Sequence, residues 1–433
     1  MISGKRRWMK FFLVICLLPI YSASAQLTIE ITGGVEAAQP IAIVPFGAAE
    51  GGIPPVDMAA IIGADLARTG HFRPMPTRDM LDMPTTREEV DFRDWSLLGM
   101  NNLVIGRIEP DPTGYRVSFS LFDVFRGTEL AGSSLVSTKS GMRQTAHRIA
   151  DDIYEKLTGQ PGVAATRIAY ITSTGSGDNL TVTLRVADAD GYNPQTIVSS
   201  AEPLMSPAWS PDGRRLAYVS FENKRAAIYI QELSSGRREL VAGHPGINGS
   251  PAFSPDGTRL AMTLSKDGNP DIYSLNLLSR ELTRLTDHYA IDTEPSWSPD
   301  GQSIIFTSDR GGSPQIYRMA ATGGAAERIS REGNYNGRAS YAPDGRSIVM
   351  VTRVNGAFRI GVLDPARGVT RLLSRGDLDE SPSFAPNGAM VIYAAIHGGR
   401  GVLETASVEG GGSQRLTQDS GQVREPAWSP LRR

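Results

Sequence analysis

Acidic side chains recur in this 433-residue chain just before short runs that lead to an aromatic residue. Asp292, Glu294, Glu380 and Glu425 occupy such positions. Carboxylate oxygens are the ligands that hard cations such as Ca²⁺ take from proteins, so these residues offer a site for a cation. Their spacing fits no EF-hand loop or other metal motif, and nothing in the sequence requires an ion.

No catalytic motif accompanies these carboxylates. The chain has no G-x-S-x-G elbow, no P-loop, no G-x-G-x-x-G after a strand and no H-E-x-x-H. Its histidines lack metal-ligand spacing, which favours surface or capping roles. They are His71, His147, His244, His288 and His397. The sequence therefore predicts a protein that is not an enzyme and has no cofactor and no bound metal.

A repeated unit positions the acidic residues. The segment SPAWSPDGRRLAYVS at 206–220 returns along the chain with an aromatic anchor in each copy, at spacings of 44, 44, 44, 43 and 44 residues. The anchors are Trp209, Phe253, Trp297, Tyr341, Phe384 and Trp428. A fixed period in the low forties, built on short β-type runs, is typical of a β-propeller whose repeats are four-stranded blades.

Each repeat contains signals for four strands, A to D. The aromatic run is strand A, and the Ser-Pro-Asp-Gly after it suits a type I turn, with Pro second and Gly fourth. The first copy, from residue 167, lacks strand A, whereas EPAWSP at 425–430 is a strand A with nothing after it. These halves complete one blade. We therefore predict a six-bladed β-propeller over residues 167–433, closed by the C-terminal strand.

The same repeat predicts a binding face. The A–B turns are short and nearly identical, whereas the D–A loops differ between blades and meet at the mouth of the central channel. Taken singly, polar residues there could cap strands and keep the rim hydrated. Taken together, they predict a partner-binding face. Its expected members are Met205, Asn248, Ser250, Thr293, Glu294, Arg338, Glu380, Arg424 and Glu425.

The first 25 residues are typical of a secretory signal peptide. Four Lys and Arg residues within 5–10 precede the apolar run at 11–20, and the A-x-A site predicts cleavage after Ala25. The apolar run is too short to span a bilayer, and an uncleaved anchor is the alternative. Cys16 is the one cysteine of the chain, so the mature protein is expected to have no disulfide.

The charge of the mature chain also limits its partners. Removing residues 1–25 leaves 40 Lys and Arg against 46 Asp and Glu, a net charge of −6. This balance gives no reason to expect binding to nucleic acid or to an anionic lipid surface. No later stretch reaches 18 apolar residues, so we expect no insertion into a membrane. The sequence has no heptad pattern that would indicate an oligomer, so we expect a monomer.

Residues 26–160 lie outside the repeat and are expected to form a separate α/β domain, which gives an α+β two-domain chain. The apolar run at 41–46 is typical of a buried strand, and 102–110 and 115–124 are strand-like.

Helices are expected at 55–69 and at 141–158. The second segment has one apolar face, and Gly159 directly after it is typical of a helix end. That face consists of Ala146, Ile149, Ile153 and Leu157. Residues 161–166 would be the linker between the two domains.

Several segments resemble the TolB family, the periplasmic β-propeller proteins of the Tol–Pal system. They include VPF at 44, LRVADADGYN at 184, PLMSPAWSPDG at 203 and the final EPAWSP. The resemblance covers the whole mature chain. It implies a periplasmic protein within a machine that links the inner membrane, peptidoglycan and outer membrane, and that supports outer-membrane integrity and outer-membrane invagination during cell division.

The resemblance also implies two binding sites. The peptidoglycan-associated lipoprotein Pal would bind the propeller mouth, with Thr293 and Glu294 in the matching TEP motif and Asn248 in the matching NG. Ile247 departs from the family pattern, which has a polar residue there. Bacteriocins would use the same mouth.

The inner-membrane protein TolA would bind the mature N-terminus, whose alternating pattern suits either strand addition to a partner sheet or the first strand of its own domain. This segment is Gln26, Leu27, Thr28, Ile29, Glu30 and Ile31. The alternative to this two-site protein is a periplasmic propeller that binds a small ligand or metal in its channel, or catalyses a reaction there.

Overall fold

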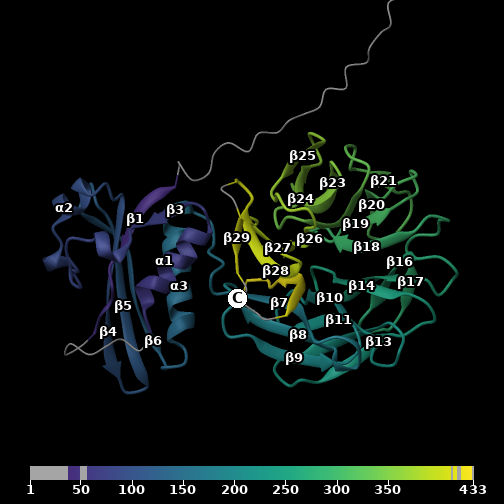
Figure 1. The fold of residues 1–433 in the computed structure, drawn as a ribbon, viewed down its shortest axis with the longest axis horizontal. Helices are drawn as coiled ribbons and strands as arrows, with labels where there is room; N and C mark the ends of the chain where they lie inside the picture. The colour runs from purple at the N-terminus through teal and green to yellow at the C-terminus, as the bar shows by residue number, and fades with distance from the viewer. Residues whose placement is uncertain (1–37, 49–55, 411–412, 417–420, 432–433) are drawn as a thin grey trace, which may run out of the picture. The chain divides into compact units, whose positions relative to one another are not determined.

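The computed structural model describes residues 38–48, 56–410, 413–416 and 421–431 (Figure 1). The expected signal peptide and the expected TolA segment at 26–31 lie outside these ranges. No helix within them has the length and the apolar character of a membrane span.

A mixed sheet with the strand order β3-β1-β4-β5-β6 forms the core of the N-terminal part, and β2 pairs with β4. Its strands are β1 (Gln39–Ile43), β2 (Gly47–Ala48), β3 (Phe72–Pro74), β4 (Asn102–Asp111), β5 (Gly114–Asp123) and β6 (Thr128–Ser137). Strand β1 pairs in parallel with both β3 and β4, so it is central, and Ile41 and Ala42 are fully buried. This explains the unbroken apolar run in the sequence.

Two longer helices pack against each other beside this sheet: α1 (Met58–Arg68) and α3 (Met142–Thr158). Helix α1 begins where the Asp57 side chain accepts a hydrogen bond from the Ala60 amide at 3.0 Å. Helix α3 ends at Gly159 in the left-handed conformation, as its sequence predicted. Ala146, Ile149 and Ile153 are fully buried in the domain core.

Strand β6 and the short helix α2 (Phe92–Leu97) were not predicted from the sequence. Strand β6 is mostly small and polar and lacks apolar alternation, and α2 is too short to show a helical period. Within the described ranges there are also three 3-10 turns: η2 (Thr77–Asp79), η3 (Arg87–Glu89) and η4 (Gly177–Asn179).

Six four-stranded antiparallel sheets form the propeller (Figure 1). Blade 1 has β10 (Leu204–Trp209), β11 (Arg215–Ser220), β12 (Ala227–Glu232) and β13 (Arg238–Ala242). Blade 2 has β14 (Asn248–Phe253), β15 (Arg259–Leu264), β16 (Asp271–Asn276) and β17 (Leu282–Arg284). Blade 3 has β18 (Asp292–Trp297), β19 (Ser303–Ser308), β20 (Gln315–Ala320) and β21 (Glu327–Arg328).

The remaining blades follow the same order, except that the last combines both ends of the repeat region. Blade 4 has β22 (Asn336–Tyr341), β23 (Ile348–Val354), β24 (Ala357–Asp364) and β25 (Val369–Leu372). Blade 5 has β26 (Glu380–Phe384), β27 (Met390–His397), β28 (Arg400–Ser407) and β29 (Ser413–Arg415). Blade 6 has β30 (Gln422–Trp428), β7 (Arg167–Thr174), β8 (Thr181–Asp188) and β9 (Gln195–Ser200).

Strand β30 closes the ring by pairing with β7, with Trp428 opposite Ile168. The Trp428 indole Nε1 also donates to Thr166 Oγ1 at 2.7 Å. The predicted six-bladed propeller, closed by the C-terminal strand after an N-terminal domain, is confirmed.

The Ser-Pro-Asp-Gly segments form tight A–B turns that repeat from blade to blade. In blade 1 the Gly213 amide donates to Ser210 O at 2.8 Å, and the Ser210 hydroxyl donates to Asp212 at 2.5 Å. Gly213 has a φ of 65°, in the left-handed region that favours glycine. Blades 2 and 3 repeat these bonds, so this end of the propeller has one fixed backbone geometry.

Candidate functional site

A ring of six backbone bulges shapes the channel mouth. Every A strand shifts its register against its B strand. One residue at each shift has a φ between 48° and 57°. We call these residues the mouth ring: Ser206, Ser250, Glu294, Arg338, Ser381 and Glu425. Left-handed φ values are strained for residues other than glycine, and such strain gathers at ligand-binding and catalytic sites.

The mouth ring lines a cavity of about 220 Å³. Four of its members were predicted for the binding face: Ser250, Glu294, Arg338 and Glu425. Four other predicted residues lie one position earlier in their strands: Met205, Thr293, Glu380 and Arg424. The bulge explains the offset, because it inserts one residue and so changes which side chain faces the channel.

Asn248 was predicted to be an exposed contact of the binding face, but the structure shows it buried. It is 1% exposed, and its side chain holds its own loop. Its Oδ1 accepts from the His244 amide at 2.9 Å, and its Nδ2 donates to His244 O at 2.7 Å. Asp292, Asn336 and Asp379 are buried at the matching position in the next three blades. This position organises the mouth loops and is not displayed at the surface.

Arg338 links several blades across the mouth. Its Nε lies 3.2 Å from Glu294 Oε1, its Nη1 donates to Ser381 Oγ, and its Nη2 lies 3.6 Å from Glu425 Oε2. Burial disfavours the charged guanidinium, but the carboxylates of Glu425, Glu294 and Glu380 outweigh it and raise the pKa of Arg338. The mouth therefore contains a permanent positive charge between two carboxylates.

All four carboxylates that the sequence offered to a cation have a guanidinium partner. Glu294 and Glu425 share Arg338. Glu380 lies 3.9 Å from the guanidinium of Arg424. Asp292 is fully buried and pairs with Arg310 at 2.7 Å. Three guanidinium groups thus face these four carboxylates, which leaves one net negative charge at the mouth.

Five exposed apolar side chains lie in or just after the D–A loops that lead into the mouth ring, and we call them the mouth collar. Met205 lies in strand β10, and the other four lie in D–A loops: Ile247, Tyr289, Ile291 and Leu378. Tyr289 is 86% exposed and stacks on His288, with ring centroids 4.3 Å apart. Exposed apolar residues beside polar ones are typical of a protein interface. Only Met205 and Ile247 were singled out from the sequence, although large apolar residues in otherwise polar loops indicate the others.

The opposite end of the channel is a wider cavity of about 1550 Å³. Prolines of the A–B turns line it together with Trp209, Phe384 and Trp428. The sequence analysis expected little surface at this end because the turns are tight. The ring of turns encloses space, but its lining repeats between blades, unlike the mouth.

Asp65, His147 and Asp190 are the one group of three potential metal ligands found in the described ranges. His147 is fully buried rather than superficial, and its Nδ1 lies 2.6 Å from Asp65 Oδ2. Burial lowers the pKa of His147, but the bond to Asp65 outweighs burial and raises it. Arg68 and Arg143 already pair with Asp65 and Asp190, so the group is a buried ion-pair network.

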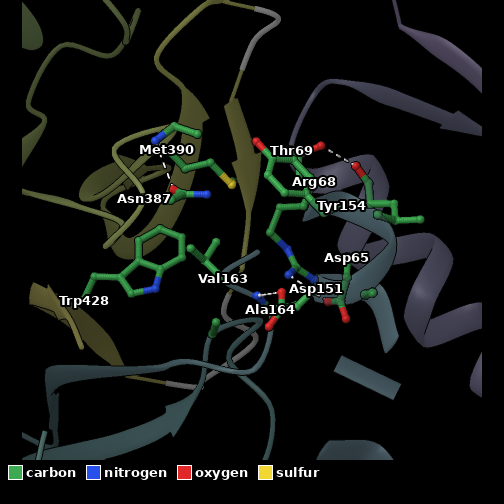
Figure 2. Close-up of a pocket in the computed structure, with 14 residues that line it drawn as sticks. Asp65, Arg68, Thr69, Asp151, Tyr154, Val163, Ala164, Asn387, Met390 and Trp428 are labelled. Atoms are coloured by element: carbon green, nitrogen blue, oxygen red, sulfur yellow. Dashed lines mark hydrogen bonds and ion pairs between the residues drawn. The ribbon is translucent and has the colours of Figure 1, made fainter. Parts of the chain in front are cut away.

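In a small pocket beside this network, Asp151 binds the segment that leads into the propeller. Figure 2 shows Asp151 next to Ala164, with Met390, Asn387 and Trp428 on the other side. The Asp151 carboxylate accepts from the Ala164 amide at 2.7 Å and the Ala165 amide at 2.9 Å. Burial is the largest influence on Asp151 and raises its pKa to about 7, although these two bonds act to lower it.

Comparisons with known proteins match both parts of the chain. The family model of the TolB amino-terminal domain matches residues 27–130, and that of the TolB beta propeller domain matches residues 154–432. The Tol-Pal system proteins TolB of Xanthomonas oryzae pv. oryzae (strain KACC10331 / KXO85) and Xanthomonas campestris pv. campestris (strain B100) are each 52% identical over 432 residues, or 98% of both chains.

A solved structure agrees. The crystal structure of TolB from Acinetobacter baumannii is 40% identical in sequence and superimposes with a TM-score of 0.85. The match covers 93% of this chain and 99% of the other.

Proposed function

This chain belongs to the TolB family of Tol–Pal system proteins, and we propose that it binds Pal at its propeller mouth and TolA through its mature N-terminus. In this role it is a periplasmic interaction protein that supports outer-membrane integrity and the invagination of the outer membrane during cell division. Bacteriocins would bind the same mouth during their import into the cell.

The mouth carries the proposal, because it combines an apolar collar with a charged centre. Interfaces commonly bury aromatic and aliphatic anchors and use polar groups for orientation. Tyr289 and Ile291 supply exposed anchors on one loop, and Arg338 between Glu294 and Glu425 supplies fixed charges at the mouth. Pal would cover the collar with apolar side chains and place polar groups over the mouth ring.

The mouth is also prepared for binding before a partner arrives. Buried Asn248 fixes one D–A loop, and the side chain of Asn336 donates to Glu332 O at 2.7 Å to fix another. Glu294 accepts from Thr307 Oγ1 and from the Arg338 amide, both at 2.8 Å. Ordered loops and fixed charges reduce the entropy lost on association.

The TolA part of the proposal rests on the sequence. Gln26–Ile31 lies outside the described residues, and its alternating apolar pattern suits addition to a strand of a partner. The two sites are then separable, since one belongs to the propeller and the other to the chain terminus.

The test is to measure Pal and TolA binding to the same three variants of the mature protein. Tyr289→Ser combined with Ile291→Ser should weaken Pal by about ten-fold or more and leave TolA unchanged, since lost anchors cost over 1 kcal/mol. Deletion of 26–31 should abolish TolA binding and spare Pal. Leu278→Ser is the matched control, because Leu278 is 93% exposed in a C–D turn on the opposite face.

Two outcomes would refute the proposal. If the Tyr289 and Ile291 double variant bound Pal as tightly as the unsubstituted protein, the mouth would not be part of the Pal interface. Loss of both partners in the deletion variant would assign residues 26–31 to the fold.

A further inference from the structure

A second exposed apolar site lies in the N-terminal domain, far in sequence from both proposed sites. Helix α2 and the turn between β5 and β6 form a groove of about 410 Å³. Leu97 on the helix is 77% exposed, and Phe125 on the turn is 68% exposed. Two large apolar side chains that line one groove and remain in water are typical of a docking site.

The fold itself does not need these two side chains. Trp95 anchors α2 in the domain core at 2% exposure, and Val124 anchors the turn at 2%. Leu97 and Phe125 point away from that core, so they add little to stability while they add apolar surface to the groove.

Both walls of the groove are fixed. The Asp91 side chain accepts from the Arg93 amide at 2.9 Å and so caps α2. Across the groove, the Arg126 amide donates to Asp123 at 3.0 Å, and the Arg87 guanidinium donates to Gly127 O at 3.2 Å. A groove held by its own hydrogen bonds can accept a ligand with little reorganisation.

Both charged side chains that line the groove are arginines. Arg93 and Arg126 line it, and its lining residues in the described ranges include no carboxylate. Arg126 is 78% exposed, with Asp123 at 3.8 Å. Arg93 forms no ion pair with the residues that the structure describes. Two arginines beside apolar anchors complement a ligand that is both apolar and acidic.

We propose that this groove docks a segment of a partner protein that places one apolar or aromatic side chain between Leu97 and Phe125 and its carboxylates on Arg93 and Arg126. The groove is lined by residues other than those assigned to the propeller mouth and to the segment at 26–31. It gives the N-terminal domain a binding surface of its own.

A peptide fits better than an anionic membrane surface. Asp91, Asp94 and Glu88 are exposed close to the groove, on α2 or just before it, and would oppose approach to negatively charged headgroups. A peptide that enters the groove contacts its lining residues and avoids these carboxylates.

The experiment is to pan a random twelve-residue phage-displayed peptide library on the full mature protein. Each round is counter-selected on the Leu97→Ser and Phe125→Ser double variant, so peptides that bind the propeller mouth are removed. The probe is then the most enriched peptide, synthesised with a fluorophore, and the readout is fluorescence anisotropy. We expect enriched peptides to carry Phe, Trp or Leu next to Asp or Glu.

Two variants and one control complete the test. The probe should bind about ten-fold more weakly both to the double Ser variant and to Arg93→Gln with Arg126→Gln, which are surface changes, and equally to Leu278→Ser. Failure to enrich any peptide, enrichment of peptides without acidic residues, or unchanged binding to the Gln variant would overturn the proposal. Binding of the protein to phosphatidylglycerol vesicles that is lost in the double Ser variant would overturn it in favour of a lipid surface.

Discussion

The two ends of the propeller channel use the same repeat for different purposes. At the A–B end, Ser-Pro-Asp-Gly recurs with the same hydrogen bonds, and its glycines have φ values of 65° in blade 1 and 69° in blades 2 and 3. At the mouth, the bulged backbone recurs in six blades, but the side chains at the bulge are three serines, two glutamates and one arginine.

If the mouth is the binding face we propose, this difference separates stability from recognition. Where both backbone and side chain repeat, the residues serve the closure and rigidity of the ring. Where only the backbone repeats, the side chains are free to differ and to bind. Substitutions at the turn end should therefore change the free energy of unfolding, and substitutions at the mouth should change affinity.

The largest expected effect lies at the closing strand. Trp428 is 7% exposed and donates to Thr166 at 2.7 Å, so Trp428→Ala should lower the free energy of unfolding by about 3–5 kcal/mol. Denaturant titration would measure the loss. Pal affinity of the remaining folded protein should stay unchanged, and a loss of affinity in fully folded protein would break the division between the two ends.

A matched pair within blade 2 sharpens the comparison. Gly257 at the turn and Ser250 at the mouth both have left-handed φ values, 69° and 48°. Gly257→Ser should lower the free energy of unfolding by about 1–2 kcal/mol, because a side chain is strained there. Ser250→Gly should raise the free energy of unfolding by less than about 1 kcal/mol. The substitution relieves backbone strain in the folded state, and the extra conformational freedom of the unfolded chain offsets part of that gain. Thermal unfolding of both variants distinguishes these signs, and a loss on Ser250→Gly would show that the mouth bulge carries no strain.

A pH titration tests the same division. Asp151 has a pKa of about 7 in the folded protein, above its ordinary 3.8, because burial favours the protonated form. The native state then binds more protons than the unfolded state, so the contribution of Asp151 to stability falls as the pH rises from about 4 to about 7. Asp151→Asn should flatten this part of the stability profile.

The mouth should behave differently over that range. The raised pKa of Arg338 keeps its charge fixed, so Pal affinity should not follow the Asp151 profile. Parallel changes in affinity and stability would mean that the buried carboxylate and the mouth are linked.

The smallest effect concerns the rim of the mouth. Arg424 and Glu380 are 3.9 Å apart and partly exposed, a geometry whose contribution to stability is usually below about 0.5 kcal/mol. Arg424→Gln should leave the melting temperature unchanged and alter the rate of Pal association at low salt more than the rate of dissociation. Stopped-flow kinetics at two ionic strengths would measure this.

Much of the fold follows from the sequence because the repeat is local and regular. The aromatic spacing and the Ser-Pro-Asp-Gly turns predicted the blades, and the unmatched strands at the two ends predicted closure by β30. Helix α3 was predicted from its apolar face. Helix α2 and strand β6 gave no such period and were missed.

The site was predicted less completely because a bulge is set by tertiary packing. A residue before proline normally adopts an extended conformation with negative φ, yet Glu294 and Glu425 precede prolines and have φ values of 57° and 51°. The sequence therefore located the mouth loops and four of the six mouth-ring residues, but not Ser206 or Ser381. The burial of Asn248 and His147 likewise depends on partners that the sequence does not place.

Amide hydrogen exchange with and without Pal tests the central claim most directly. Pal should slow exchange in the D–A loops at 243–250, 287–294 and 375–381, which carry most of the mouth collar. Exchange in the A–B turns at 210–213, 254–257 and 298–301 should stay as it is in the free protein. Protection of those turns, with the D–A loops unchanged, would contradict the assignment of recognition to the mouth.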